Sequence, residues 1–247
     1  MIDGAVAAGV LVYNAGEDLA RCVDSLRALF PVERIFVTDN ASSDDAASLL
    51  PPEIRVSRNA TNIGYCAGMN ALLRWAKREG AEFLLSINPD ATIDERSVRV
   101  LLDACGEQRV ALAHPKILRR DSGVLDGAYG EITWRHLAVR MLGEGVADAP
   151  RWDKRKFVPF GHGACFVARI DAVFAVGGYA EEFFAYQDEA ELGRRLAAAG
   201  WRIVYEPRAR AYHHGPWGNT DREHLKKYFL ARNSVLLLKN TAGGITR

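Results

Sequence analysis

The sequence has no long apolar run and no marked excess of either charge. Its apolar stretches fall short of the roughly 18 residues that a membrane-spanning helix needs. The segment from Met1 to Gly9 lacks the basic start and apolar core of a secretory signal. The net charge is +1, whereas nucleic-acid-binding proteins usually carry a clear basic excess. These absences predict a cytoplasmic protein that does not bind nucleic acid.

Cysteine is also scarce, and two common nucleotide-binding motifs are missing. The four cysteines are far apart and form no CxxC pair, so we expect reduced thiols in the core rather than disulfides or a zinc site. The first apolar segment is not followed by GxGxxG, and the chain contains no GxxxxGK[ST] loop. A nucleotide, if one binds, is therefore held in another way.

The first half of the chain alternates short apolar segments with segments whose apolar residues recur every three or four positions. The former predict strands at 6–12, 34–38, 54–57, 82–87 and 110–113, and the latter predict helices at about 19–29, 69–76 and 94–105. This order is typical of an α/β protein with right-handed crossovers and a mostly parallel central sheet flanked by helices. Nearly half of the 247 residues are apolar, which is enough for one such domain with a sizeable core.

The second half is less regular. We expect a hairpin over 116–127, a strand over 157–169, a short helix over 170–176, a helix over 188–199, a strand over 202–206 and a final helix over 221–239. The apolar spacing from Trp134 to Leu142 predicts another helix, followed by a basic run at 151–156. Three roles are open for this basic amphipathic segment: peripheral contact with the inner face of a membrane, a lid over an acceptor, or a homodimer contact.

Polar clusters follow three of the predicted strands. They are Tyr13-Asn14, Asp39-Asn40 and Asn88-Pro89-Asp90. Each alone is explained by turn formation, because Asn, Asp and Pro are common turn residues. Ligands of parallel sheets, however, bind beyond the carboxyl ends of the strands. Three clusters at the same predicted edge therefore indicate a binding site.

The order and spacing of several short segments resemble glycosyltransferase family 2, and within it the rhamnosyltransferase-like bacterial enzymes of cell-surface polysaccharide synthesis. The resembling segments are 10–14, 37–44, 62–65 with Asn70, 85–90, 177–179 with 183–186, 188–192 with Arg195, 207–213, and 232–233 with 239–240. The resemblance implies a single GT-A domain over 1–247. In it, 1–115 is the nucleotide-sugar-binding half and 116–247 the acceptor-binding and catalytic half, with a smaller acceptor-side region in the second half.

The resemblance also implies substrates and donor-binding residues. The donor would be a dTDP- or UDP-sugar, such as a rhamnose donor, and the acceptor a hydroxyl of a glycan or polyprenyl-linked sugar. Asp39 would accept a hydrogen bond from the imide of uracil or thymine, although it also fits a turn-capping role. The other donor-binding residues would be Tyr13, Asn14, Asn62, Gly64, Asn70, Asn88 and Arg232. Arg232 falls on an apolar stripe of Leu225, Tyr228, Phe229 and Leu236, so it needs an anionic partner or lies at the edge of the stripe.

Asn88-Pro89-Asp90 occupies the place of the family's DxD-like motif, which implies a bound divalent cation. A hard cation such as Mg²⁺ is commonly held by one or two carboxylates together with substrate phosphates. Asp90 supplies one carboxylate, and His213, with His214 as its neighbour, matches the family's late histidine. Imidazole suits Mn²⁺ better than Mg²⁺, so the expected cofactor is either ion. The plain structural roles are a turn residue for Asp90 and a half-buried strand histidine for His213.

The acidic run from Asp188 to Glu191 begins a predicted helix. The spacing of these two residues fits a capping box, which leaves Glu189 without a structural role. The family pattern is Glu-Asp-x-Asp, so this chain has the first two acids in reversed order. The resemblance places the general base at Glu189, with Asp188 as the alternative. The helix dipole would favour the ionised form that a base needs, and inversion in a single displacement would follow.

Two other functions fit parts of the sequence. A nucleotidyltransferase also uses an α/β sheet and a metal, but it would need a glycine-rich, basic loop where this chain has residues 14–17. A catalytically inactive relative, which binds a nucleotide sugar or a partner enzyme, is supported only by the reversed order of Asp188 and Glu189.

Overall fold

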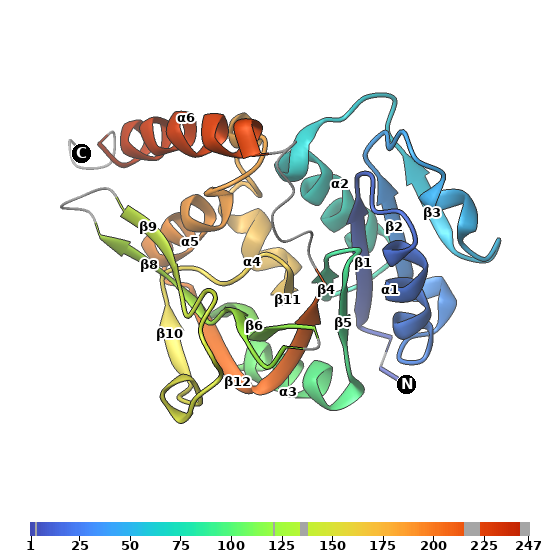
Figure 1. The fold of residues 1–247 in the computed structure, drawn as a ribbon, viewed down its shortest axis with the longest axis horizontal. Helices are drawn as coiled ribbons and strands as arrows, with labels where there is room; N and C mark the ends of the chain where they lie inside the picture. Colours follow the sequence, from blue (N-terminus) through green and yellow to red (C-terminus); the bar gives the residue numbers. More distant parts are fainter. Residues whose placement is uncertain (3, 121, 134–137, 215–222, 243–247) are drawn as a thin grey trace.

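The computed structural model describes residues 1–2, 4–120, 122–133, 138–214 and 223–242. In these ranges one mixed sheet has the strand order β10-β12-β6-β11-β4-β1-β2-β3, with short β5 and β7 paired to β12 and β6 (Figure 1). The strands are β1 (Val6–Val12), β2 (Ile35–Asp39), β3 (Arg55–Arg58), β4 (Phe83–Ile87), β5 (Ala91–Ile93), β6 (Val110–Arg119), β7 (Leu125–Gly127), β8 (Tyr129–Thr133), β9 (Ala138–Leu142), β10 (Lys156–Val158), β11 (Cys165–Arg169) and β12 (Arg202–His213). The α-helices are α1 (Asp18–Arg27), α2 (Gly64–Arg78), α3 (Glu95–Gly106), α4 (Ile170–Ala175), α5 (Asp188–Ala198) and α6 (Glu223–Ala242).

The parallel half of the sheet confirms the predicted α/β class. β3, β2, β1 and β4 run parallel to one another. β1 and β2 are buried almost throughout, which explains why their sequences are continuously apolar rather than alternating. β11 lies antiparallel between β4 and β6, and β12 runs parallel to β6. The carboxyl ends of β1, β2 and β4 therefore meet at one edge of the sheet.

Helices cover both faces of the sheet, and each face has its own core (Figure 1). α1 and α3 bury Leu26 and Leu101 against one face. On the other face, α2, α5 and α6 contribute Leu72, Leu196 and Leu237. Burying one such leucine contributes about 1.5–3 kcal/mol. The four cysteines are buried and free, as predicted. None of the helices in the described ranges is long and apolar enough to cross a membrane.

Two glycines allow α2 to lie close against β1. A Cβ atom on Gly9 would come within 2.7 Å of the Leu72 side chain, and one on Gly68 within 2.7 Å of Leu11. The Leu72 side chain of α2 therefore packs against Gly9 of β1, and the Leu11 side chain of β1 packs against Gly68 of α2. This close approach brings the start of α2 to the edge of the sheet where the polar loops lie.

We predict that Gly9→Ala destabilises the protein. The new methyl group would overlap Leu72 in a packed core, and overpacking typically costs about 1–3 kcal/mol. Urea unfolding measures the loss. Gly106→Ala is the control, because a Cβ atom there meets no heavy atom within 4 Å. Equal stability of the Gly9 variant and the wild type would show that the two elements are not in close contact.

The predicted helix over 134–142 is wrong. Ala138–Leu142 forms β9, which pairs antiparallel with β8 in a separate hairpin, and Trp134–Leu137 lies outside the described residues. Val139 and Met141 pack against the core from alternate positions, which is the period of a strand and not of a helix. The proposed basic amphipathic helix is therefore absent from the described part of this segment.

Two further expectations need correction. The strand expected over 157–169 is two strands, β10 and β11, separated by a loop that contains Pro159 and two glycines. The apolar stripe expected on the last helix is only partly buried, because Leu225 and Tyr228 are each 60% exposed while Phe229 and Leu236 are half-buried. The buried face of α6 instead carries Asn233 and Leu237.

Candidate active site

The loops that follow β1 and β2 are joined by hydrogen bonds. Asn14 has a left-handed backbone with φ of 55°, and its Oδ1 accepts a hydrogen bond from Ser43 N at 2.7 Å. At the end of β2, Asp39 Oδ1 accepts one from Ser42 N at 2.8 Å, and Oδ2 lies 3.1 Å from Arg58 Nη1. The turn-capping role of Asp39 is therefore present, and its recognition of a pyrimidine base stays a prediction. Tyr13, 42% exposed, borders these loops.

Asn40 connects the same loops to the start of α2. Its Nδ2 donates to Asn62 Oδ1 at 2.8 Å and to the Gly64 carbonyl at 3.1 Å. Its Oδ1 accepts from Ile63 N and Asn59 Nδ2 at 3.1 and 3.0 Å. The structure thus brings together five predicted donor-binding residues at one end of the sheet. These are Tyr13, Asn14, Asp39, Asn62 and Gly64.

The predicted metal ligands also meet. His213 Nε2 lies 3.0 Å from Asp90 Oδ1 and 3.4 Å from Asn88 Nδ2. β4 delivers Asn88 and Asp90 at its carboxyl end, and β12 delivers His213 at its own. Asp90 and His213 are each mostly buried, so the pair forms a half-enclosed polar site beside the donor-side loops.

Two residues that the sequence did not single out support this pair. Asp126, at the end of the β6–β7 hairpin, accepts a hydrogen bond from His213 Nδ1, with its Oδ2 2.6 Å away. The same oxygen lies 3.3 Å from His162 Nε2. His162 Nδ1 in turn accepts from Ala164 N at 3.1 Å, so its Nε2 carries the proton. Asp126 therefore fixes the orientation in which His213 directs Nε2 toward Asp90.

Charge is concentrated in this cluster. Burial disfavours the charged form of His213, but hydrogen bonds to Asp126 and Asp90 outweigh it and raise the pKa to about 9. For Asp126, burial is likewise outweighed by hydrogen bonds from His162 and His213, which hold the pKa of this carboxyl below its usual range. Without a metal, His213 is therefore an imidazolium ion between two carboxylates.

We predict a pH-dependent contribution of His213 to the stability of the metal-free protein. Because the pKa is raised in the folded state, the contribution is complete below pH 6.5 and is lost as the pH rises through about 9. The free energy of unfolding in EDTA should therefore fall more over this range for the wild type than for His213→Gln. Urea unfolding at a series of pH values measures it.

His224→Gln is the matched control, since His224 is exposed on α6. Its pH dependence should equal that of the wild type. The assignment is wrong if His213→Gln shows the same pH dependence as well.

The acids at the start of α5 lie at the end of a strained loop. Phe184, Tyr186 and Gln187 all have positive φ angles, between 60° and 70°, and a non-glycine residue in this region costs about 1–3 kcal/mol. Gln187, not Asp188, is the N-cap residue, and its side chain makes no capping hydrogen bond. The predicted capping box is therefore wrong.

The third acid has a separate structural task. Glu191 is 1% exposed and forms an ion pair with Arg195, with Oε1 and Oε2 2.8 and 2.9 Å from the arginine Nε. Arg195 also donates from Nη1 to the Val176 carbonyl. This bidentate pair fastens α5 to the end of α4 and leaves the other two acids available for chemistry.

Asp188 and Glu189 share a poorly solvated environment. Asp188 is 3% exposed, and its Oδ2 makes no hydrogen bond within the described structure. Burial and the neighbouring Glu189 raise the pKa of Asp188 well above its usual range. Burial also raises the pKa of Glu189, against opposing effects of the backbone and His162. Desolvation thus opposes the ionised form that the helix dipole would favour.

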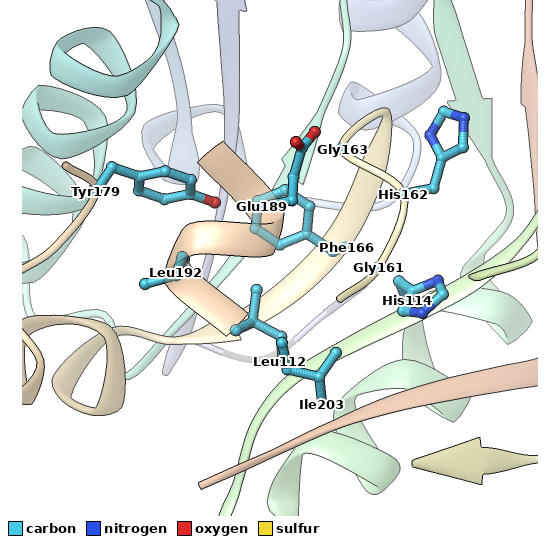
Figure 2. A pocket seen from close by; sticks show the side chains of 10 residues that line it. All are labelled: Leu112, His114, Gly161, His162, Gly163, Phe166, Tyr179, Glu189, Leu192 and Ile203. Atoms are coloured by element: carbon cyan, nitrogen blue, oxygen red, sulfur yellow. The ribbon is translucent and has the colours of Figure 1, made fainter. Parts of the chain in front are cut away.

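Glu189 stands over a small apolar cavity (Figure 2). The cavity measures about 20 Å³, and Figure 2 shows Tyr179 on one side of Glu189 and the loop carrying His162 on the other. A Cβ atom on Gly163 would lie 2.4 Å from Glu189 Oε1. Only glycine therefore lets this loop pass so close to the carboxylate. The loop contacts Glu189 through Gly163 and Asp126 through His162.

Two predicted donor-binding residues lie elsewhere. Asn70, 4% exposed, hydrogen-bonds to the backbone of Tyr179 and to Glu181. Arg232 donates to the carbonyls of Glu182 and Phe183. These partners are backbone oxygens and not the anionic group that the sequence predicts. Asn70 and Arg232 both contact the segment that precedes the acids at the start of α5. Their predicted contacts with the donor stay predictions.

Known proteins resemble this chain in sequence and in fold. The model of the family described as "Glycosyl transferase family 2" matches residues 8–172. The chain belongs to glycosyltransferase family 2. It is 27% identical over 234 residues to the N-acetylglucosaminyl-diphospho-decaprenol L-rhamnosyltransferase of Mycobacterium tuberculosis, covering 83% of this chain and 74% of the relative. It is 24% identical over 235 residues to the low-salt glycan biosynthesis hexosyltransferase Agl10 of Haloferax volcanii, covering 92% and 75%.

Solved glycosyltransferases share the fold. The structure of GalNAc-T7 with UDP, GalNAc and Mn²⁺ matches with a TM-score of 0.66 at 18% identity, over 85% of this chain and 44% of the other. The Pyrobaculum calidifontis mannosyltransferase PcManGT, in complex with GDP-Man and Mn²⁺, matches with 0.62 at 15% identity, over 87% and 58%. The chain therefore spans only about half the length of these two proteins. The family 2 chain has the GT-A fold, as the sequence predicts, and it is a glycosyltransferase.

Proposed function

We propose that this glycosyltransferase moves a sugar from a dTDP- or UDP-sugar to a hydroxyl of a glycan or polyprenyl-linked acceptor, with inversion at the anomeric carbon. The observation that carries the proposal is the position of the loop 161–163, which contacts both the base candidate Glu189 and the Asp126–His213 pair. Leaving group and acceptor hydroxyl would thus occupy opposite sides of one site. The relative from Mycobacterium tuberculosis, whose name specifies rhamnose and a diphospho-decaprenol acceptor, supports the substrate classes.

The residues present fit a divalent cation. Asp90 and His213 offer a carboxylate oxygen and an imidazole nitrogen that converge on one point. The described residues hold no group of three or more His, Cys, Asp or Glu suited to a metal, so the donor phosphates would complete the coordination, as is usual for Mg²⁺. When bound, the cation would neutralise the charge that develops on the departing diphosphate. Mn²⁺ accompanies the nucleotide or nucleotide sugar in both solved structures compared here.

The chain's own residues would perform the remaining work. The Asn40-centred loops would bind and orient the nucleotide. Glu189 would accept the proton of the acceptor hydroxyl at its carboxylate as that oxygen attacks the anomeric carbon. A raised pKa makes a carboxylate a stronger base, and enzymes commonly tune such a group toward the working pH. The low exposure of the site would keep water from competing with the acceptor.

We predict that Glu189→Gln separates activity from stability. Turnover should fall about 10²–10⁴-fold because the general base is lost. The same variant should unfold at a higher temperature at pH 8, because a neutral amide removes the penalty of burying a charge. A carboxyl whose folded pKa is raised loses stability as the pH rises through that pKa, so the gain should shrink at pH 4.5. Turnover and thermal unfolding of the same preparations measure both effects.

Asp188→Asn is the matched comparison, since it changes the neighbouring acid by the same substitution. It should keep most of the turnover and also gain stability. If Asp188→Asn is inactive and Glu189→Gln is active, the base is Asp188.

We also predict that nucleotide binding depends on metal through Asp90. Calorimetric titration with UDP, dTDP, GDP and ADP, each with and without Mn²⁺, should show the pyrimidine diphosphates binding most tightly and only with metal. Asp90→Ala should abolish the metal dependence. Asp94→Asn is the control, because Asn can still cap α3 in place of Asp94. Undiminished metal dependence in Asp90→Ala, or tighter binding of a purine diphosphate, would contradict the corresponding assignment.

A further inference from the structure

Residues 177–187, here called the acid loop, connect α4 to the catalytic acids at the start of α5. The acid loop is in contact with two buried asparagines from helices far apart in the sequence, Asn70 of α2 and Asn233 of α6. Neither asparagine touches Glu189 in the contacts described above. Both instead bind the backbone that carries it.

Asn233 is fully buried, and its amide faces three backbone carbonyls. Its Nδ2 lies 3.0 Å from the Phe183 oxygen, 2.7 Å from the Ala185 oxygen and 2.7 Å from the Tyr186 oxygen. An asparagine amide has two hydrogens, so the three carbonyls share them. Carbonyls of one short segment point toward a common centre only when the backbone is tightly curled, and Asn233 supplies the donor at that centre.

Asn70 holds the other end of the acid loop. Its Nδ2 donates to the Tyr179 carbonyl at 2.9 Å, and its Oδ1 accepts from Tyr179 N at 2.8 Å. The same Nδ2 lies 2.9 Å from Glu181 Oε1. Gly178 has φ of 77° and passes so close that a Cβ atom would lie 2.6 Å from Asn70 Oδ1. The Gly177-Gly178-Tyr179 motif therefore fits around this asparagine.

The acid loop also touches the donor side of the site. Cys66 N, in the first turn of α2, donates to the Phe184 carbonyl at 3.1 Å. A Cβ atom on Gly64 would lie 2.6 Å from the Phe184 ring. Gly64 is linked through Asn40 to the loops at the ends of β1 and β2. The position of the acid loop is thus set from α2 and α6 together and is joined to the predicted donor-binding loops.

We propose that Asn70 and Asn233 are positioning residues for the general base. They hold the acid loop in a conformation that its own sequence does not favour, since Phe184, Tyr186 and Gln187 all have positive φ. The direction in which α5 begins, and with it the place of the Glu189 carboxylate, follows from that conformation. This inference rests on the proposed role of Glu189.

The test compares Asn233→Asp and Asn233→Ala with the wild type. Asp keeps the volume of Asn but replaces the amide donor by a carboxylate, which would face three carbonyl oxygens. Hydrolysis of dTDP-rhamnose in Mn²⁺ gives kcat, calorimetry with dTDP gives nucleotide affinity, and hydrogen exchange reports the backbone amides of 183–190. Both variants should lower kcat about 10²-fold, the typical result of a small misplacement of a catalytic group. The dissociation constant of dTDP should stay within about twofold, and exchange at 183–187 should accelerate.

Leu237→Ala is the control for a general loss of α6 packing, because Leu237 is buried one turn beyond Asn233 but contacts the core. It should destabilise the protein without lowering kcat at a temperature well below unfolding. The proposal is overturned if Asn233→Asp retains wild-type kcat, or if Leu237→Ala loses as much kcat as the Asn233 variants. Asn70→Ala should reproduce the kcat loss and accelerate exchange at 177–181. If Glu189→Gln keeps full turnover, the assignment of the base fails instead, while the exchange data still decide whether the asparagines hold the loop.

Discussion

The constraint on which the site depends is the placement of a buried carboxylate, Asp188, beside a half-buried one, Glu189. Asp188 is almost fully buried, and Glu189 is wedged between Tyr179 and Gly163. Desolvation disfavours their charged forms and raises the pKa of both. A protein places such groups at a buried helix start only if other interactions hold the backbone there. Here these are the hydrogen bonds of Asn70 and Asn233 and the Glu191–Arg195 ion pair.

The proposed metal site is held by different interactions. Asp126 accepts hydrogen bonds from two histidines, and this fixes the ring of His213 with Nε2 toward Asp90. With His213 protonated between two carboxylates, the cluster keeps a net negative charge when no cation is bound. A metal at this point would replace the proton on Nε2, so proton release would accompany metal binding. In either state, Asp126 would hold the orientation of the His213 ring.

The parallel half of the fold and the edge on which the site lies were predictable from the sequence. Buried parallel strands are continuously apolar, and the polar residues that follow them mark the edge where ligands bind. The motifs around Asp39, Asp90 and Glu189 therefore pointed to the candidate site, and their roles there stay predictions. The helix predicted over 134–142 was wrong for its described part, 138–142, because a short apolar run fits both the helical and the strand period. Val139 and Met141 pack on the core from alternate positions, as residues of a strand do.

The supporting residues were not predictable, because their roles exist only in three dimensions. Asp126 lies in the short strand β7 and His162 in the loop between β10 and β11, and both segments are too short to show a periodic pattern. The two glycines that flank His162 are nevertheless a local signal of close packing. Asn70 and the Arg232-Asn233 pair were recognised as motif residues, but they lie 163 residues apart (233 minus 70). Only the structure shows that both hold the acid loop. The capping box failed for a related reason: Arg195 and burial, not the helix end, determine where Glu191 and Asp188 point.

The anomeric configuration of the product tests the central claim most directly. A single displacement, with the cation site on one side of the sugar and Glu189 on the other, inverts the configuration of the donor. Proton NMR of the first product formed from dTDP-rhamnose, recorded before any later equilibration, should therefore show the configuration opposite to that of the donor. Retention of the donor's configuration would contradict the account, because it requires a second displacement that this arrangement of residues does not provide.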